Sequence, residues 1–125
     1  MMKRTLIGLA MMALAAGVSV PALAGGPGVY TVKGNNGEPD SDYTGTLTIV
    51  QTSKDTYKLT WMIAGDKYEG FAIGDNRILA ASFTSKGASG TALLVEDDEN
   101  KGGYKSIWAF KGETSLGIEL IAPKQ

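Results

Sequence analysis

Residues that turn or break a chain recur at short intervals after Gly25, and this rhythm limits the fold more than any other feature. Clusters of Gly, Asn, Asp, Ser and Pro bound short apolar runs, and no window keeps its apolar residues at helical spacing. Short runs separated by turn signals about every eight to twelve residues are typical of β-sandwiches and β-barrels. We therefore predict an all-β domain.

Alternation within the runs assigns their faces. In residues 43–52 the apolar side chains fall on every second position, as they do in residues 57–63. Because successive side chains of a strand point to opposite faces, each run has one face for a core. The expected strands number about eight, and they cover residues 29–33, 43–52, 57–63, 67–73, 78–83, 91–96, 104–110 and 115–122.

The connections between these runs are mostly short, which favours antiparallel neighbours. Eight short antiparallel strands leave unpaired edges unless they close, so we predict an up-and-down β-barrel, with a β-sandwich as the alternative. Two polar segments, residues 34–42 and 84–90, are expected to be the larger loops.

One pattern occurs twice. Tyr57, Trp61, Gly65 and Gly70 recur in the same order and with the same gaps as Tyr104, Trp108, Gly112 and Gly117. We infer two similar four-strand halves. Tyr and Trp lie four apart in each copy, so they share a strand face, where they either line a ligand cavity or fill the core. The regular repeat favours packing layers over two binding patches, and the glycines are expected at turns, bulges or bends.

The first 24 residues have the pattern of a secretory signal peptide. A basic head with Lys3 and Arg4 precedes an apolar stretch, and Ala22-Leu23-Ala24 supplies the small residues of a cleavage site. We predict cleavage after Ala24, a single domain at residues 25–125 and no membrane span after cleavage. The expected location is the periplasm or the outside of a bacterial cell. Loss of Lys3 and Arg4 makes the net charge of −1 more negative, which does not favour nucleic acid.

Few residues suit catalysis or metal binding. The chain has no His and no Cys, so it lacks an imidazole base, a thiol nucleophile and the usual zinc ligands. Glu69 and Glu119, each beside the second glycine of a repeat, are the carboxylates considered for a hydrolase. The acidic run at residues 96–100 lacks the spacing of an EF-hand loop. We predict no catalytic residue, no metal site and no cofactor.

The chain resembles a group of small secreted bacterial proteins, some of which carry a fibronectin-binding label. The resemblance lies in a Gly-x-Tyr opening at Gly28, a Tyr-x-Gly strand at Tyr43, the Tyr-x-x-x-Trp strand at Tyr57 and a closing Gly-x-Glu-x-Leu at Gly117. The layout is also similar to the calycins, the lipocalins and avidins, although Tyr30 stands where lipocalins have the Trp of Gly-x-Trp. This resemblance implies a barrel that holds a small ligand.

Three functions follow from these observations. The first is an exported, non-enzymatic binding protein for a small apolar ligand, with Tyr57, Trp61, Tyr104 and Trp108 as the candidate contacts. The second is a module that binds a protein partner, as a hydrolase inhibitor or an adhesin, with homodimerisation a further option. The third is a carboxylate-dependent hydrolase.

Overall fold

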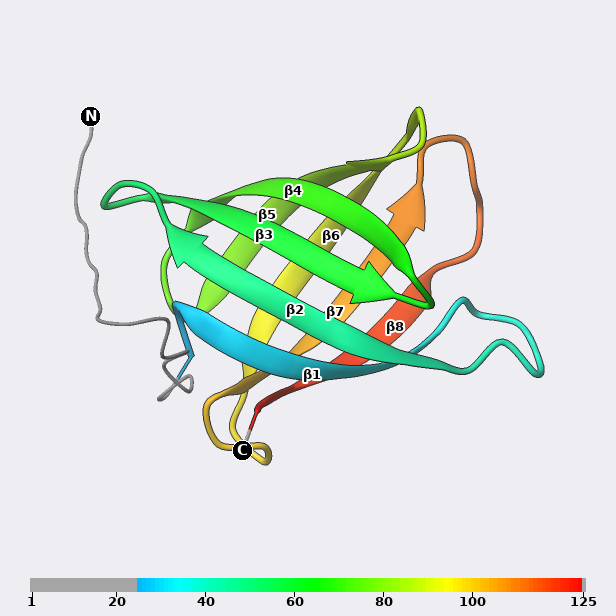
Figure 1. The fold of residues 1–125 in the computed structure, drawn as a ribbon. Helices are drawn as coiled ribbons and strands as arrows, with labels where there is room; N and C mark the ends of the chain where they lie inside the picture. The colour runs from blue at the N-terminus through cyan, green and yellow to red at the C-terminus, as the bar shows by residue number, and fades with distance from the viewer. Residues whose placement is uncertain (1–24, 125) are drawn as a thin grey trace.

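The computed structural model describes residues 25–124, so the predicted signal peptide lies outside the described residues. Eight antiparallel strands close into one up-and-down barrel, in which each strand pairs with its neighbours in sequence and β8 pairs with β1 (Figure 1). The predicted barrel is confirmed, and the sandwich alternative is not observed. The strands are β1 (Gly28–Asn35), β2 (Tyr43–Gln51), β3 (Thr56–Ile63), β4 (Asp66–Gly74), β5 (Ile78–Ser85), β6 (Ala88–Asp97), β7 (Gly103–Phe110) and β8 (Gly117–Pro123).

The alternation read from the sequence places the core inside the barrel. Leu47 and Ile49 of β2 and Leu59 and Trp61 of β3 are buried, while Lys58, which precedes Leu59, faces solvent. Burial of these apolar side chains is the main favourable term in closing the sheet. On the outer surface, several large apolar side chains of β4 to β8 are exposed: Phe71, Ile73, Ile78, Val95, Ile107, Ile118 and Leu120.

The two ends of the barrel differ. At one end, called here the closed end, the residues that precede β1 lie against the core. The Gly26 N–H donates to the Tyr104 hydroxyl at 2.7 Å, and Tyr104 donates to the Asn76 carbonyl at 2.8 Å. Tyr30 donates to the Gly26 carbonyl. Tyr104 therefore joins the start of the domain to the β4–β5 turn, and this end of the barrel is sealed.

At the other end, called here the open end, lie the β1–β2, β3–β4, β5–β6 and β7–β8 connections (Figure 1). The β1–β2 loop is the most extended of them and is tied internally, because the Asn35 amide donates to Asp42 Oδ1 at 2.9 Å. Ala64 and Gly65 form the β3–β4 turn, and both have positive φ.

The predicted loop at residues 84–90 is wrong. β5 runs to Ser85 and β6 starts at Ala88, so that only Lys86 and Gly87 turn the chain. Both have positive φ, which suits the twist of a two-residue hairpin. The small polar residues of this segment, which are common in loops, lie here on paired strands.

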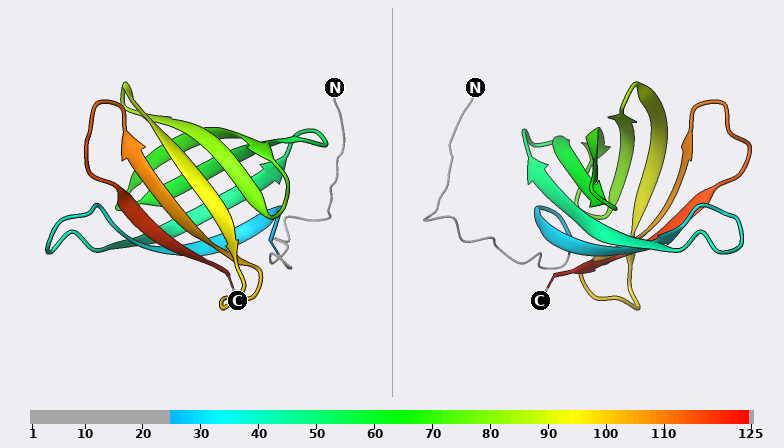
Figure 2. Two further views of the ribbon diagram at one scale, coloured as in Figure 1. Left: turned by 180° about the vertical axis from the view of Figure 1, so that it is seen from behind. Right: turned by 45° about the vertical axis from the view of Figure 1, so that its right-hand side comes forward.

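The two strands that carry the repeated pattern lie opposite each other in the barrel. β3 and β7, which carry the Tyr–Trp copies, are separated by three strands in either direction around the ring. Figure 2 shows the strands of the second half, yellow-green to red, closing the barrel against those of the first half. The described residues include no helix of the length and hydropathy required to cross a membrane.

Candidate functional site

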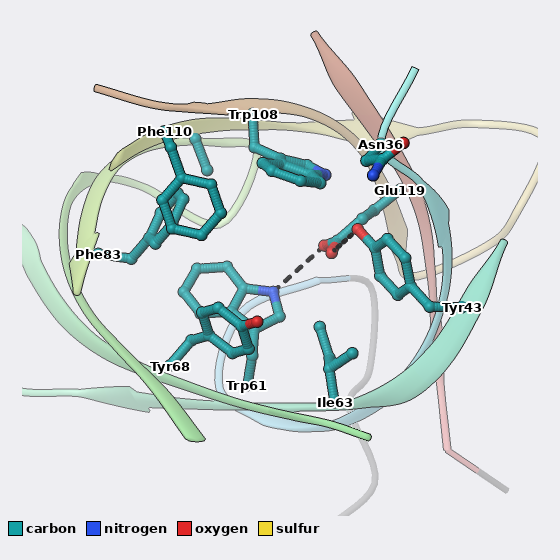
Figure 3. Close-up of a pocket in the computed structure, with 10 residues that line it drawn as sticks. Asn36, Tyr43, Trp61, Ile63, Tyr68, Phe83, Trp108, Phe110 and Glu119 are labelled. Carbon is teal, nitrogen blue, oxygen red and sulfur yellow. Dashed lines mark hydrogen bonds between the residues drawn. The ribbon is translucent and has the colours of Figure 1, made fainter. Parts of the chain in front are cut away.

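A cavity of about 250 Å³ lies inside the open end of the barrel. Six aromatic side chains, one aliphatic rim residue and one carboxylate contribute most of its wall, and they come from β2, β3, β4, β5, β7 and β8 (Figure 3). The lining residues are Asn36, Tyr43, Trp61, Ile63, Tyr68, Phe83, Ala92, Trp108, Phe110 and Glu119.

Glu119 is the charged group of this cavity. It lies on β8 between the outward-facing Ile118 and Leu120, and only 4% of its surface is exposed. Its two oxygens accept hydrogen bonds from different strands: Tyr43 Oη donates to Oε2 at 2.6 Å and Trp61 Nε1 donates to Oε1 at 3.2 Å. Figure 3 shows the carboxylate between these two donors, pointing into the pocket.

Burial raises the pKa of the Glu119 carboxyl above its ordinary value of 4.5, because the charged form loses its hydration. The hydrogen bonds from Tyr43 and Trp61 act in the opposite direction. The pKa of Tyr43 is also raised, first by burial and then by the charge of Glu119. Tyr43 is therefore a protonated donor at neutral pH, and none of the described cavity-lining residues is a Lys or an Arg.

Phe83 is the centre of the aromatic wall. Its ring lies 5.9 Å from Trp61, 6.4 Å from Trp108 and 5.4 Å from Phe110, each measured between centroids and each edge-to-face. Tyr68 joins the group through Phe83 at 6.4 Å. Edge-to-face pairs exploit the negative face and positive edge of each ring. The rings therefore hold one another in place while part of their surface borders the cavity.

Glycines on the adjoining strands make room for the rings. A Cβ added to Gly117 would lie 2.1 Å from Trp108 Cε2, and one added to Gly70 would lie 2.9 Å from Trp61 Cζ3. Gly90 faces Phe83 in the same way, with 2.4 Å to Cζ. The predicted bulge is absent at Gly70, where the pairing of β4 with both neighbours is uninterrupted. The indole ring of each repeat's tryptophan therefore packs against the second glycine of that repeat, where a Cβ would overlap it.

The four predicted contact residues divide between the two ends of the barrel. Trp61 and Trp108 line the cavity, as the binding hypothesis expected. Tyr57 and Tyr104 lie at the closed end beside Asn76, where they are buried and do not line the cavity. The two tryptophans therefore line the cavity, and the two tyrosines pack in the core at the closed end.

Sequence reasoning missed most of the remaining wall. Tyr43, Tyr68, Phe83 and Phe110 each lie near an end of a strand, and those strand ends meet at the open end of the barrel. Alternation alone gives their inward direction. Their convergence requires the strand register, which makes Phe83 a partner of Gly70 and Gly90 and Phe110 a partner of Gly90.

The carboxylate pair considered for a hydrolase does not form. Glu119 is inside the barrel, whereas Glu69 is exposed on the outer face of β4, 4.0 Å from the Lys67 ammonium. The acidic run at residues 96–100 forms the end of β6 and part of the β6–β7 turn. Buried Asp97 accepts a hydrogen bond from the Glu99 N–H at 3.1 Å there. No group of three or more potential metal ligands gathers among residues 25–124.

Two buried polar atoms near Glu119 have no hydrogen-bond partner among the described residues. They are Trp108 Nε1 and Ser106 Oγ, and Ser106 is the register partner of Glu119 across β7 and β8. Buried donors without an acceptor are uncommon in folded proteins. The barrel therefore buries the Trp108 N–H and the Ser106 hydroxyl close to the one buried carboxyl group without pairing them.

Glu119 makes stability depend on pH in a direction that can be tested. Because its folded-state pKa is raised, the native state holds this proton more tightly than the unfolded chain does. The free energy of unfolding should fall as pH rises from the ordinary pKa of 4.5 through the raised pKa, and it should level off above that. The Glu119→Gln variant should lack this fall.

Urea unfolding of both proteins from about pH 4 to about pH 8 tests this expectation. The difference in unfolding free energy between wild type and Glu119→Gln should change with pH, with the wild type losing relative stability as the acid ionises. A difference that stays constant across the range would contradict the assignment of Glu119 as a buried titrating group.

Comparisons with protein-family profiles, with curated proteins and with solved structures give no match to this chain, so the resemblance to the calycins stays a prediction.

Proposed function

We propose that the protein is a non-enzymatic binding protein that holds a small organic molecule in the cavity at the open end of the barrel. The observation that carries this proposal is the cavity itself, about 250 Å³ with a wall of aromatic rings around one buried carboxylate. Small-molecule sites are typically concave and mostly apolar, with few polar groups that fix orientation.

The size of the cavity limits the ligand. An engineered apolar cavity of about 150 Å³ accommodates benzene. A cavity of about 250 Å³ has room for one aromatic ring or branched alkyl group with a short substituent. A longer molecule would extend past Asn36 and Ile63 at the rim into solvent.

The chemistry of the wall supports binding over hydrolysis. Hydrolysis of a glycosidic bond normally uses two carboxyl groups across the scissile bond, and Glu119 is the one carboxyl group among the described residues that line this cavity. Tyr43 and Trp61 occupy one acceptor site on each of its oxygens. A ligand held here contacts aromatic rings and one carboxyl group. We further propose that binding takes place after export, on the basis of the N-terminal sequence.

Thermal unfolding with n-butylbenzene, a neutral probe that fits this volume, tests the proposal. A molecule that binds only the native state raises its stability in proportion to RT ln(1 + [L]/Kd). We expect the melting temperature of the 25–125 chain to rise with probe concentration. Trp61 and Trp108 are the only tryptophans of the chain and both line the cavity, so their fluorescence should change over the same range.

Two Ala→Leu variants provide the matched control. Ala92 is buried in the cavity wall, whereas Ala80 is exposed on the outer face of the adjacent strand β5. Ala92→Leu should abolish the probe-dependent shift because its side chain fills the cavity, and Ala80→Leu should preserve it. An unchanged response in a folded Ala92→Leu protein, or the absence of any response in the wild type, would contradict the proposal.

A further inference from the structure

The cavity contains a buried carboxyl group with no cationic partner among the described residues. Glu119 is buried, and the described residues that line the cavity include no Lys or Arg. Its hydrogen bonds come from Tyr43 and Trp61, two uncharged donors. Buried charges in proteins are normally paired, because their desolvation is otherwise uncompensated. A bound cation would supply the missing partner.

The hydrogen bonds around Glu119 favour its ionised form as the ligand contact. Trp61 Nε1 can only donate, so Oε1 must act as an acceptor, and Tyr43 donates to Oε2. An ionised carboxylate has about four acceptor sites, of which these bonds use two. The remaining acceptor capacity suits an N–H of a ligand, and a cationic N–H makes the stronger bond.

The aromatic wall provides a second attraction for positive charge. Trp61, Trp108 and Tyr43 surround the carboxylate, and Tyr68, Phe83 and Phe110 lie across the cavity from it (Figure 3). The face of an aromatic ring carries partial negative charge, and cations bind it within about 6 Å of the centroid. Anions have the opposite preference and would also be repelled by Glu119.

We propose that the ligand is a small organic cation, an amine or ammonium group on an apolar body, whose charge pairs with Glu119 while the aromatic rings enclose the body. This inference rests on the proposed function, and it adds the chemical class of the ligand.

Three probes with related bodies and different charges test the class: 2-phenylethylamine, 2-phenylethanol and phenylacetate. Each has one ring and a short polar arm, which fits the volume of the cavity. Titration of the wild type, followed by tryptophan fluorescence and by calorimetry at neutral pH, should show the amine binding about tenfold or more tightly than the alcohol. Phenylacetate should bind most weakly of the three.

Two Glu→Gln variants distinguish the effect of the carboxyl group in the cavity from the effect of the protein's net charge. Glu119→Gln should weaken binding of the amine about tenfold or more and change binding of the alcohol by less than about threefold. Glu69→Gln, which removes one negative charge from the outer surface, should leave both unchanged. An equal loss of amine affinity in the two variants would overturn the assignment to Glu119.

The pH dependence of the wild type is a test that needs no variant. Acidification through the raised pKa of Glu119 should weaken binding of the amine and leave the alcohol unaffected. The other titratable side chains that line the cavity are Tyr43, whose pKa burial raises above its ordinary value of 10.0, and Tyr68. Neighbouring β1 and β7 present Gly34 and Ser106 to Glu119, and neither side chain titrates.

The outcomes distinguish the two proposals. If the alcohol binds as tightly as the amine, or if only n-butylbenzene binds, the cavity is a binding site and the cationic class is wrong. If neither these probes nor n-butylbenzene binds, the proposed function fails and the inference fails with it. Tighter binding of the amine that depends on Glu119 supports both.

Discussion

Tyr104→Phe should destabilise the barrel by about 2–3 kcal/mol, although it removes a single oxygen atom. That oxygen accepts from the Gly26 N–H at 2.7 Å and donates to the Asn76 carbonyl at 2.8 Å. Both Tyr104 and Gly26 are buried, so the variant leaves a buried N–H without a partner. The unmade hydrogen bond costs more than the average net contribution of a hydrogen bond because the group is also cut off from water.

The matched control is Tyr57→Phe, the same change in the other copy of the repeat. Within residues 25–124, the Tyr57 hydroxyl makes one hydrogen bond, which it donates to Asn76 Oδ1 at 3.3 Å. We expect a loss below about 1 kcal/mol in the free energy of unfolding, measured by urea denaturation. Equal losses for the two variants would mean that the Gly26–Tyr104–Asn76 connection does not seal the closed end.

Gly117→Ala should cost about 1–3 kcal/mol and should change the ligand cavity as well. The new Cβ would lie 2.1 Å from Cε2 of Trp108, so the indole ring must move. Trp108 packs edge-to-face on Phe110 at 5.8 Å and lines the cavity, so the displacement affects both the aromatic wall and the binding site.

Gly70→Ala gives a graded comparison on the equivalent strand. Its Cβ would lie 2.9 Å from Trp61 Cζ3 and 3.0 Å from the Ser82 carbonyl, a milder overlap. We expect a smaller loss of stability than for Gly117→Ala, with a smaller change in tryptophan fluorescence. A larger loss of unfolding free energy for Gly70→Ala would show that overlap with backbone atoms, and not overlap with the indole rings, determines the requirement for glycine.

Much of the fold could be predicted because the information is local. Alternation placed Leu47, Ile49 and Leu59 inside before any pairing was known, and the turn residues separated the strands. The error at residues 84–90 has a local cause too. Thr84, Ser85, Ser89 and Gly90 are weak indicators of a strand on their own, and only their pairing across the Lys86-Gly87 turn makes them strand residues.

The candidate site was only partly predictable, since Trp61 and Trp108 were identified as cavity candidates together with Tyr57 and Tyr104. The structure separates the tryptophans from the tyrosines by about half the length of a strand: the tyrosines lie toward the closed end and the tryptophans toward the open end. Residues four apart share a face, but they lie about 13 Å apart along an extended strand. A shared face therefore does not imply a shared site.

The sequence by itself determined the class of the domain, the inward and outward faces of most strands and the equivalence of its two halves. Only the tertiary structure decided that Glu119 lies within reach of Tyr43 and Trp61, and that six rings from five strands surround one cavity. The side to which a residue points follows from its own strand, because the alternation is a local property. Its depth within the barrel follows from the stagger of all eight strands, which is fixed only when β8 pairs with β1.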